Sequence, residues 1–300
     1  MKPPDLEKLR RSGLISATAR ETCKKMIVPG ARLEEIAITA EQIILDMGGR
    51  PAFPAQLSRN NIAAHYCSPP GDPTEVQPGD IVKLDLGTHV DGYVTDNAVT
   101  VDLAGGPDSA LVAASSMALE AAIGSMGPGA AIVEIGRQIE QTIKAFGFNP
   151  VYNLTGHGVA RFVIHCAPSI PNYPDPRTGH LRPNQTIACE PFACDGNGFI
   201  DAVGAAEVFG VRRRPKPRDR LAPDIEAAVL AMEGLPFARR SLARHLPQAR
   251  VEEALKQLRR AKMLIDYPPL VEKNGVRVAQ TEHTIFIHED QAEVLTRSPG

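Results

Sequence analysis

The stretch PGARLEEIAITAEQIILDMGGRP (29–51) decides the fold, because the chain repeats it 99 residues later as PGAAIVEIGRQIEQTIKAFGFNP (128–150). Ten of the 23 aligned positions are identical, and the alignment needs no gap. In both copies a Pro-Gly turn precedes an amphipathic stretch that ends at glycine, the usual stop signal of a helix. We therefore predict helices at 32–47 and 131–146 and infer that the two segments arose by duplication.

The sequence around each copy supports two similar halves. A helical stretch precedes each repeated helix (5–26 and 108–126), and strand-like sequence follows it. This order predicts a mixed fold of the α/β (α+β) class. It also predicts two halves related by a pseudo-twofold axis, the first at about 1–105 and the second at about 106–210 plus 271–300. A site placed between such halves would take residues from both.

Region 211–270 interrupts this pattern. It opens with the basic, proline-rich run RRRPKPRDR (212–220). The remainder has helical composition at 223–233, about 236–245 and 249–263. We interpret it as a helical insertion in a single catalytic unit of 1–300, before a last strand at about 276–289. A solvated loop is the usual explanation of such a basic run, and an RNA contact is the alternative.

The bulk composition argues against several classes of protein. The 300 residues are 43% hydrophobic with a net charge of -2, which predicts no bulk attraction to nucleic acid or to an anionic membrane. We expect no signal peptide and no membrane span, because no apolar run approaches the roughly 20 residues that a span needs. Five dispersed cysteines without a CxxC pair are typical of reduced thiols in the cytoplasm. Cys189 and Cys194 alone are weak evidence for zinc.

Asp85 and Asp96 lie in KLDLGTHVDGYVTD (83–96), which has the composition of a β-hairpin. With the turn centred on residues 90–91 they would oppose each other, and with it centred on 91–92 they would be diagonal neighbours. Both registers place them on one face, because side chains alternate along a strand. A cation between them would relieve the repulsion of two half-buried carboxylates.

More residues of metal-binding type stand in short apolar segments. Glu190 and Glu282 are lone carboxylates in strand-like sequence, and the alternative for each is a salt bridge to an arginine. For the aspartate pair, the alternative is neutralisation by Lys83. His157 lies between glycines in TGHG, and we interpret it as a ligand as well. Four carboxylates and one imidazole suit a pair of hard or borderline divalent ions.

Two further histidines are candidates for substrate contacts. His65 and His165 could donate a hydrogen bond to a substrate oxygen or accept one from an amine, although each taken singly is more often an ordinary structural or surface histidine. Strand alternation directs His89 and His283 away from the faces that carry the carboxylates.

Segments along nearly the whole chain together resemble the methionine aminopeptidases. They are AFPAQLS (52–58), IAAHY (62–66), DLGTHVDGYVTD (85–96), NLTGHG (153–158), SIPN (169–172), EPF (190–192), YPPL (267–270) and AQTEHT (279–284). The insertion with LPFARR (235–240) resembles the type 2 branch, and the short N-terminus resembles its archaeal form. The resemblance implies the pita-bread fold of the creatinases and aminopeptidases, in agreement with the repeat.

The resemblance also implies a site with two divalent metal ions, for which Co, Mn, Fe and Zn are candidates. By resemblance, Asp96 and Glu282 bridge the ions, Asp85 completes one site, and His157 and Glu190 complete the other. A bridging water or hydroxide is then the nucleophile on the first peptide bond, and Glu190 shuttles the proton.

Further roles implied by the resemblance concern the substrate, which is the unblocked N-terminal methionine of a nascent protein, followed by a small residue. His165 would stabilise the developing oxyanion, and His65 would contact the substrate near the scissile peptide. Phe53, Ile164 and Tyr267 match positions that line the family's pocket for the methionine side chain.

The chain departs from the family pattern at Asn97, Cys166 and Thr281, which puts metal affinity and pocket shape in question. An Xaa-Pro aminopeptidase or prolidase is the competing enzyme, because it uses the same fold and ligand set. Two non-enzymatic hypotheses also stay open: a pita-bread protein that binds the ribosome or RNA without catalysis, and a metal-stabilised structural protein. We expect a cytoplasmic monomer with no membrane and no specific nucleic-acid partner, and docking on the ribosome stays open.

Overall fold

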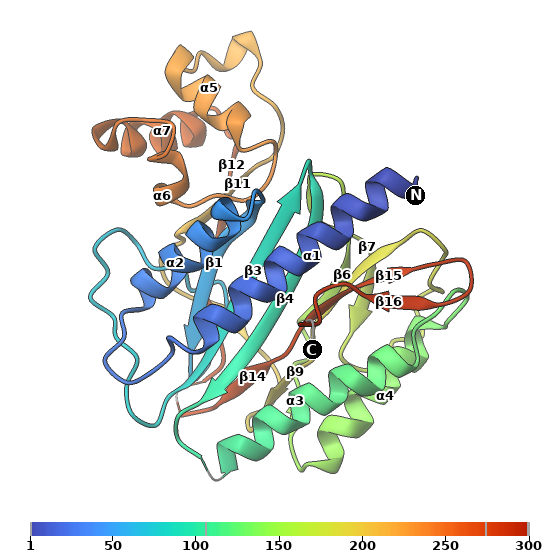
Figure 1. Cartoon of the computed structure of the whole chain (residues 1–300). Coiled ribbons are helices and arrows are strands. Elements are labelled where there is room, and N and C mark those ends of the chain that lie inside the picture. Colours follow the sequence, from blue (N-terminus) through green and yellow to red (C-terminus); the bar gives the residue numbers. More distant parts are fainter. Residues whose placement is uncertain (1, 106, 274, 299–300) are drawn as a thin grey trace.

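Each half of the chain begins with a pair of helices. The computed structural model describes residues 2–105, 107–273 and 275–298. Helices α1 (Pro3–Lys24) and α2 (Leu33–Asp46) open the first half, and α3 (Pro107–Gly124) and α4 (Ile132–Ala145) open the second. These bounds agree with the expected helices to within two residues at each end. In Figure 1, α1 and α2 lie in front of the long strands of the first half, and α3 and α4 lie side by side at the lower right.

The repeated segments share their backbone conformation as well as their sequence. The turns before α2 and α4 contain Gly30 and Gly129, with φ of 87° and 81°. Both helices end just before Gly48 and Gly147, with φ of 82° and 85°. An L-residue with a side chain rarely adopts these left-handed values, so the identical glycines of the repeat are required by the turns.

The first half contains the antiparallel sheet β1-β3-β4, formed by β1 (Arg50–Arg59), β3 (Ile81–Val90) and β4 (Tyr93–Asp102). Leu84 and Leu86 of β3 are buried in one apolar cluster with residues of α1 and α2. Because side chains alternate along a strand, Asp85 points to the opposite face of the sheet. The helices therefore cover the outer face and leave the acidic face turned toward the second half.

The β3–β4 hairpin adopts the register centred on 91–92. Asp85 pairs with Ala98, and Gly87 pairs with Asp96, so the two carboxylates are diagonal neighbours on one face. Asp91 and Gly92 at the turn have φ of 50° and 84°. Positive values at both central residues are typical of the Asp-Gly turns whose twist matches a hairpin.

The second half is built from two smaller sheets. One has the order β16-β15-β8-β6-β7 and the other has the order β14-β9-β5. Their strands are β5 (Asn149–Pro150), β6 (Thr155–Ala160), β7 (Val163–Pro171), β8 (Thr186–Cys189), β9 (Phe192–Cys194), β14 (Val278–Gln280), β15 (His283–Ile287) and β16 (Ala292–Val294). The last strand was expected to be continuous, but it breaks between β14 and β15, and Glu282 stands in the break.

The two halves meet at this break. The backbones of Ala98 on β4 and Glu282 exchange hydrogen bonds, with N–O distances of 3.4 and 3.1 Å. Thr284 Oγ1 adds a second link, since it donates to the carbonyl oxygen of Asp96 and accepts from the Asp96 N–H, both at 2.7 Å. The strands that carry the expected ligands of the two halves are therefore directly bonded to each other.

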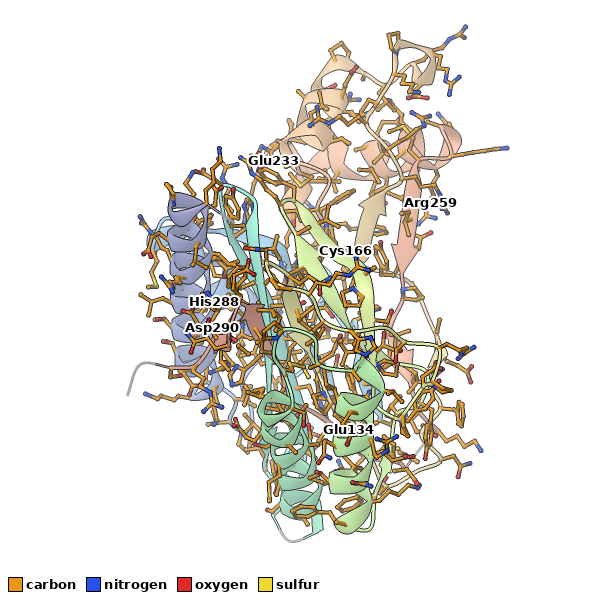
Figure 2. The ribbon with its side chains drawn as sticks, turned by 90° about the vertical axis from the view of Figure 1, so that its right-hand side faces the viewer. Glu134, Cys166, Glu233, Arg259, His288 and Asp290 are labelled. Atoms are coloured by element: carbon orange, nitrogen blue, oxygen red, sulfur yellow. The ribbon has the colours of Figure 1, made fainter. Side chains whose placement is uncertain are left out.

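The helical insertion stands above the sheets in Figures 1 and 2. It leaves by β11 (Val208–Val211) and returns by β12 (Leu264–Tyr267), which pair with each other. Between them lie η1 (Pro217–Asp219), α5 (Pro223–Ala231), α6 (Arg239–Leu242) and α7 (Gln248–Arg260), around an apolar cluster of their own. The helix expected at 236–245 is a single turn, because Phe237 instead pairs with Phe209 of β11 through two backbone hydrogen bonds of 2.8 Å. The bounds of the halves and of the insertion stay predictions.

Three short strands close the pocket side of the molecule: β2 (Ile62–Ala64), β10 (Asp201–Ala202) and β13 (Leu270–Val271), in the order β10-β13-β2. Figure 2 shows Cys166 on β7 below the insertion and Glu134 on α4 toward the far end. Across the described ranges, no helix combines the length and the apolar character that a bilayer span requires.

Candidate metal centre

The five expected ligands come from both halves and converge where these meet. Asp85 and Asp96 lie on the inner face of β3 and β4. His157 lies on β6, Glu190 directly follows β8, and Glu282 directly precedes β15. Strands β6, β8 and β15 are neighbours in one sheet, which brings these three side chains together.

The distances define a compact cluster. One potential ligand atom from each of Asp96, His157 and Glu282 lies within 4.8 Å of the others. His157 Nε2 is 3.5 Å from Glu190 Oε1 and 3.8 Å from Asp96 Oδ2. Asp85, Asp96, His157 and Glu190 line a common pocket, and Glu282 is buried behind it with 1% exposure.

The carboxylates of this cluster have no lysine or arginine beside them among the described residues. Among the described residues no arginine pairs with Glu190 or Glu282, and the polar contact to both comes from Gln280 Nε2, at 3.2 and 3.5 Å. Lys83 donates instead to the carbonyl oxygens of Asn60 and Val278, at 2.9 and 2.8 Å. The two salt-bridge alternatives are therefore wrong.

Burial and mutual repulsion perturb these groups strongly. Burial raises the pKa of Asp85 to about 7. Burial first, and then the charges of neighbouring carboxylates, hold the pKa values of Asp96, Glu190 and Glu282 well above their usual range. A group of buried acids that cannot all ionise is a frequent property of functional sites.

Unpaired oxygen atoms show what would complete the cluster. Within the described part of the chain, Asp85 Oδ1, Asp96 Oδ1 and Glu282 Oε1 are buried and accept no hydrogen bond. Native proteins rarely leave such atoms without a partner, because the desolvation cost is large. Divalent cations that prefer oxygen and imidazole ligands would satisfy all three, so the donor set fits metal binding.

His157 is prepared to act as a neutral ligand. Its Nδ1 lies 3.2 Å from the carbonyl oxygen of Gly158. Because a carbonyl oxygen can only accept a hydrogen bond, the ring proton is on Nδ1, and the lone pair of Nε2 faces the carboxylates. Burial lowers the pKa of His157 to about 3, so the ring is neutral at physiological pH.

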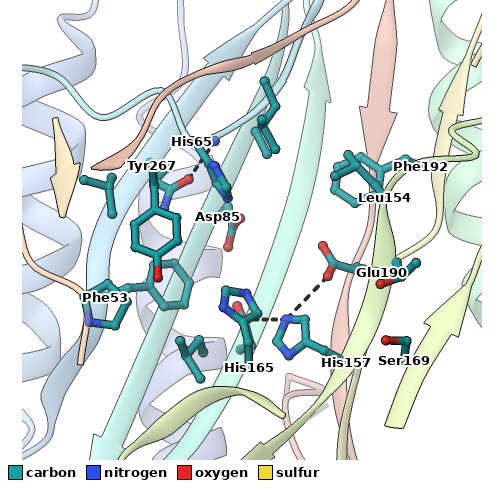
Figure 3. A pocket seen from close by; sticks show the side chains of 18 of the residues that line it. Phe53, His65, Asp85, Leu154, His157, His165, Ser169, Glu190, Phe192 and Tyr267 are labelled. Carbon is teal, nitrogen blue, oxygen red and sulfur yellow. Dashed lines mark hydrogen bonds and ion pairs between the residues drawn. The ribbon is translucent and has the colours of Figure 1, made fainter. Parts of the chain in front are cut away.

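His165 and His65 both reach the pocket. The His165 ring packs edge-on against the ring of His157 with 4.3 Å between centroids. His65 packs edge-on against Tyr267 at 6.0 Å, and burial lowers its pKa to about 4. Figure 3 shows them beside the carboxylates of Asp85 and Glu190.

The pocket beside the cluster has a volume of about 520 Å³. Phe53, Ile164 and Tyr267 form one apolar part of its lining, and Leu154 and Phe192 form another part across the cluster in Figure 3. An apolar pocket with a few convergent polar groups is the usual form of a small-ligand site.

The departures from the family pattern differ in their position. The Asn97 amide donates to Ser16 Oγ and to the carbonyl oxygen of Leu86, so it points away from the cluster toward the helices. Thr281 Oγ1 accepts a hydrogen bond from Ser115 at 3.1 Å. Cys166 lines the pocket, and it is the departure that can alter the pocket's shape.

The two excluded histidines do point elsewhere, as expected. His89 Nδ1 accepts the backbone N–H of Gly92, and His283 Nδ1 lies 2.9 Å from Thr296 Oγ1. Sequence reasoning missed Gln280 and Gln56, which are both buried at the site. The alternation that links Gln280 to Glu282 is a signal that could have identified the first.

Comparisons with known proteins show the family of the chain. The profile of metallopeptidase family M24 matches residues 7–215. The chain is 40% identical over 292 residues to a protein of Thermococcus onnurineus named methionine aminopeptidase, covering 97% of this chain and 99% of the relative. A protein of the same name from Methanothermobacter thermautotrophicus is 37% identical over 294 residues, with coverage of 97% and 98%.

A solved structure extends the comparison to the fold. The methionine aminopeptidase of Thermotoga maritima superposes with a TM-score of 0.73 and 26% identity, covering 99% of this chain and 98% of that one. The pita-bread fold expected from the repeat and from the resemblance is therefore confirmed.

Proposed function

The chain belongs to metallopeptidase family M24, and on that basis we propose that it removes the N-terminal methionine from nascent proteins whose second residue is small. The observation that carries the proposal is the set of buried carboxylates at an apolar pocket, which have no lysine or arginine beside them in the described part of the chain. Relatives that match over nearly the full length are named for the same activity. Such substrates arise in the cytoplasm, where we place the enzyme.

Two divalent ions are proposed to bind, drawn from Co, Mn, Fe or Zn. Asp96 and Glu282 would be shared by both ions, Asp85 would hold one, and His157 and Glu190 would hold the other. When bound, the ions lower the pKa of water, so that a hydroxide nucleophile is available to attack a peptide bond at neutral pH. The neutral imidazole of His157 adds no charge, so the charge of the ligand set is that of its four carboxylates.

Glu190 and His165 are proposed to be the catalytic groups of the chain itself. Glu190 lies at the pocket wall, where its carboxylate can take a proton from the attacking water and pass it to the leaving amine. Burial lowers the pKa of His165, so its neutral ring can donate an N–H to the substrate carbonyl oxygen as negative charge develops there.

The remaining pocket residues are proposed to select the substrate. Phe53, Ile164 and Tyr267 offer an apolar surface that suits the unbranched thioether side chain of methionine. His65 reaches the same pocket and would hydrogen-bond the substrate near the scissile peptide. The free α-amino group of the substrate would lie at the carboxylate cluster, and a blocked N-terminus would lose this contact.

Release of methionine from Met-Ala-Ser tests the proposal directly. The metal-free protein is titrated with Mn, Co or Fe salts, and free methionine is measured, with N-acetyl-Met-Ala-Ser and Ala-Pro peptides as comparisons. We expect activity that requires added metal and a free N-terminus. Cleavage of Ala-Pro peptides alone would favour a prolidase, and metal binding without cleavage of either substrate would favour a non-catalytic binding protein.

A further inference from the structure

Gln56 is a buried polar residue of β1 that faces both the cluster and the pocket. It pairs directly with Asp85 in the β1–β3 ladder, so the two side chains lie on the same face of the sheet. The side chain is 5% exposed and lines the pocket. Its position is therefore inside the site, although none of the proposed roles uses it.

The side chain of Gln56 holds the backbone of His65. Gln56 Oε1 accepts the His65 N–H at 2.8 Å, drawn as a dashed line in Figure 3. His65 has φ of 66°, in the left-handed region, which is unfavourable for a residue with a side chain. Such a conformation persists only where the surroundings support it, and they often do so at functional sites.

Strand β1 fixes the next residue by separate bonds. Ser58 Oγ accepts the N–H of Tyr66 at 3.3 Å, and the carbonyl oxygen of Tyr66 accepts the N–H of Leu57 at 3.0 Å. These bonds would hold the segment in place if Gln56 were altered. A change at Gln56 should therefore disturb residue 65 locally and leave the fold intact.

The direction of the His65 imidazole depends on this backbone. Within the described residues, its buried Nδ1 atom has no hydrogen-bond partner, and the ring touches Tyr267 by its edge. The ring also hydrogen-bonds the backbone carbonyl oxygen of Pro268, so its direction is set by this bond and by the Cα atom that carries it. A change in φ at residue 65 would move the imidazole relative to the substrate.

We propose that Gln56 is a positioning residue of the aminopeptidase reaction, which acts by holding His65 in its left-handed conformation. The role of His65 in the reaction rests on the proposed function. The hydrogen bond between Gln56 and the His65 backbone does not depend on that function, so the bond and the reaction can be measured separately.

A double-mutant cycle tests whether Gln56 acts through His65. Gln56→Met keeps the length of the side chain but removes the acceptor, and His65→Ala removes the imidazole. With the metal-loaded enzyme and Met-Ala-Ser, we expect Gln56→Met to lower kcat/KM about tenfold, which corresponds to one lost hydrogen bond. In the His65→Ala background the same substitution should have no further effect. Additive losses would overturn the proposal.

Two controls bound the kinetic result. Gln42→Met, on the exposed face of α2, should leave kcat/KM unchanged. The metal content of Gln56→Met should equal that of the wild type, because the role of Gln56 is its bond to the His65 backbone and not a bond to a metal ligand. A loss of metal in Gln56→Met would also overturn the proposal, since the residue would then act through the metal centre.

Amide hydrogen exchange of the metal-free protein gives a measurement without activity. The His65 amide should be protected in the wild type and in Gln56→Glu, which keeps an acceptor, and should exchange about tenfold faster in Gln56→Met. The Tyr66 amide should not change. An unaltered His65 amide in Gln56→Met contradicts the proposal whatever the activity, whereas an inactive wild type with the expected amide pattern contradicts only the proposed function.

Discussion

Two buried acidic sites in the described part of the chain, the ion cluster of Glu41 and the carboxylate cluster between the halves, are neutralised in different ways. Glu41 on α2 is 1% exposed and pairs with Arg240 at 2.7 Å and with Arg244 at 2.8 Å. The carboxylates between the halves are also buried and have no arginine or lysine beside them among the described residues. The first cluster is complete as folded, and the second requires cations from solution. The presence or absence of a neighbouring protein cation therefore distinguishes structural acids from metal-binding acids better than burial alone does.

The largest effect should follow from removing a carboxylate of the incomplete cluster. Glu282→Ala should abolish metal binding and reduce kcat/KM more than about 10³-fold, since a ligand proposed to serve both ions is lost. Methionine release and metal analysis measure the two effects. The matched variant Glu35→Ala, at an exposed site on α2, should change neither. Near-normal turnover of Glu282→Ala would contradict the claim that the carboxylates between the halves bind the catalytic metal.

Removing the acid of the complete cluster should affect stability. Glu41→Ala would leave the buried Arg240 guanidinium without its carboxylate, and it should lower the free energy of unfolding by about 3–5 kcal/mol. Bound metal per folded chain should stay constant. Glu140→Ala is the matched control, because the repeat aligns Glu140 with Glu41 but gives it only a 3.4 Å contact to Tyr152. Equal destabilisation of both variants would contradict the contrast.

A substitution beside the metal cluster should separate catalysis from metal binding. His165→Ala should lower kcat about 10²-fold, because it removes a proposed donor to the oxyanion, while the metal content stays intact. The exposed His180 provides the control His180→Ala, for which kcat should not change. Loss of metal in His165→Ala would show that this ring is a ligand.

The incomplete cluster should also weaken the metal-free protein at high pH. The pKa of Asp85 is raised from 3.8 to about 7 in the folded state, so the folded protein binds the proton more tightly. Its contribution to stability is full below about pH 4 and is lost as the pH rises through about 7. The metal-free Asp85→Asn variant should therefore gain in Tm over the metal-free wild type between pH 5 and pH 8. A difference in Tm that does not depend on pH would contradict the raised pKa.

The smallest effect should come from an exposed ion pair. Arg259 on α7 pairs with Asp266 on β12 at 2.7 Å, at the surface of the insertion. Exposed ion pairs contribute little because water screens them, so Arg259→Ala should leave Tm, metal content and methionine release unchanged. A loss of methionine release, with Tm retained, would show that this face of the insertion contacts the substrate.

The sequence predicted those features that depend on local patterns. The repeat at 29–51 and 128–150 predicted the helices because turn glycines and amphipathic spacing act within a few residues. Alternation placed Asp85 and Asp96 on one face, but it could not choose between two registers that differ only in the residues at the turn. The family resemblance supplied the grouping of the remaining ligands.

Features that arise from contacts between distant segments escaped the sequence. Glu41 and Arg240 are 199 residues apart, and nothing local to either predicts their pairing. The break at Glu282 follows from a bridge to Ala98 across the two halves. The hydrogen bond from His65 to Gln56 likewise depends on how β1 folds against the following turn.

Metal stoichiometry tests the central claim most directly. Calorimetric titration of the metal-free wild type with Mn²⁺ at about pH 6.5, in buffers of different ionisation enthalpy, counts the ions bound and the protons released. We predict two ions per chain and a release of protons, because carboxyl groups with raised pKa values must ionise to become ligands. Absence of binding, or binding that persists unchanged in Glu282→Ala, would contradict the claim that this cluster is a metal centre.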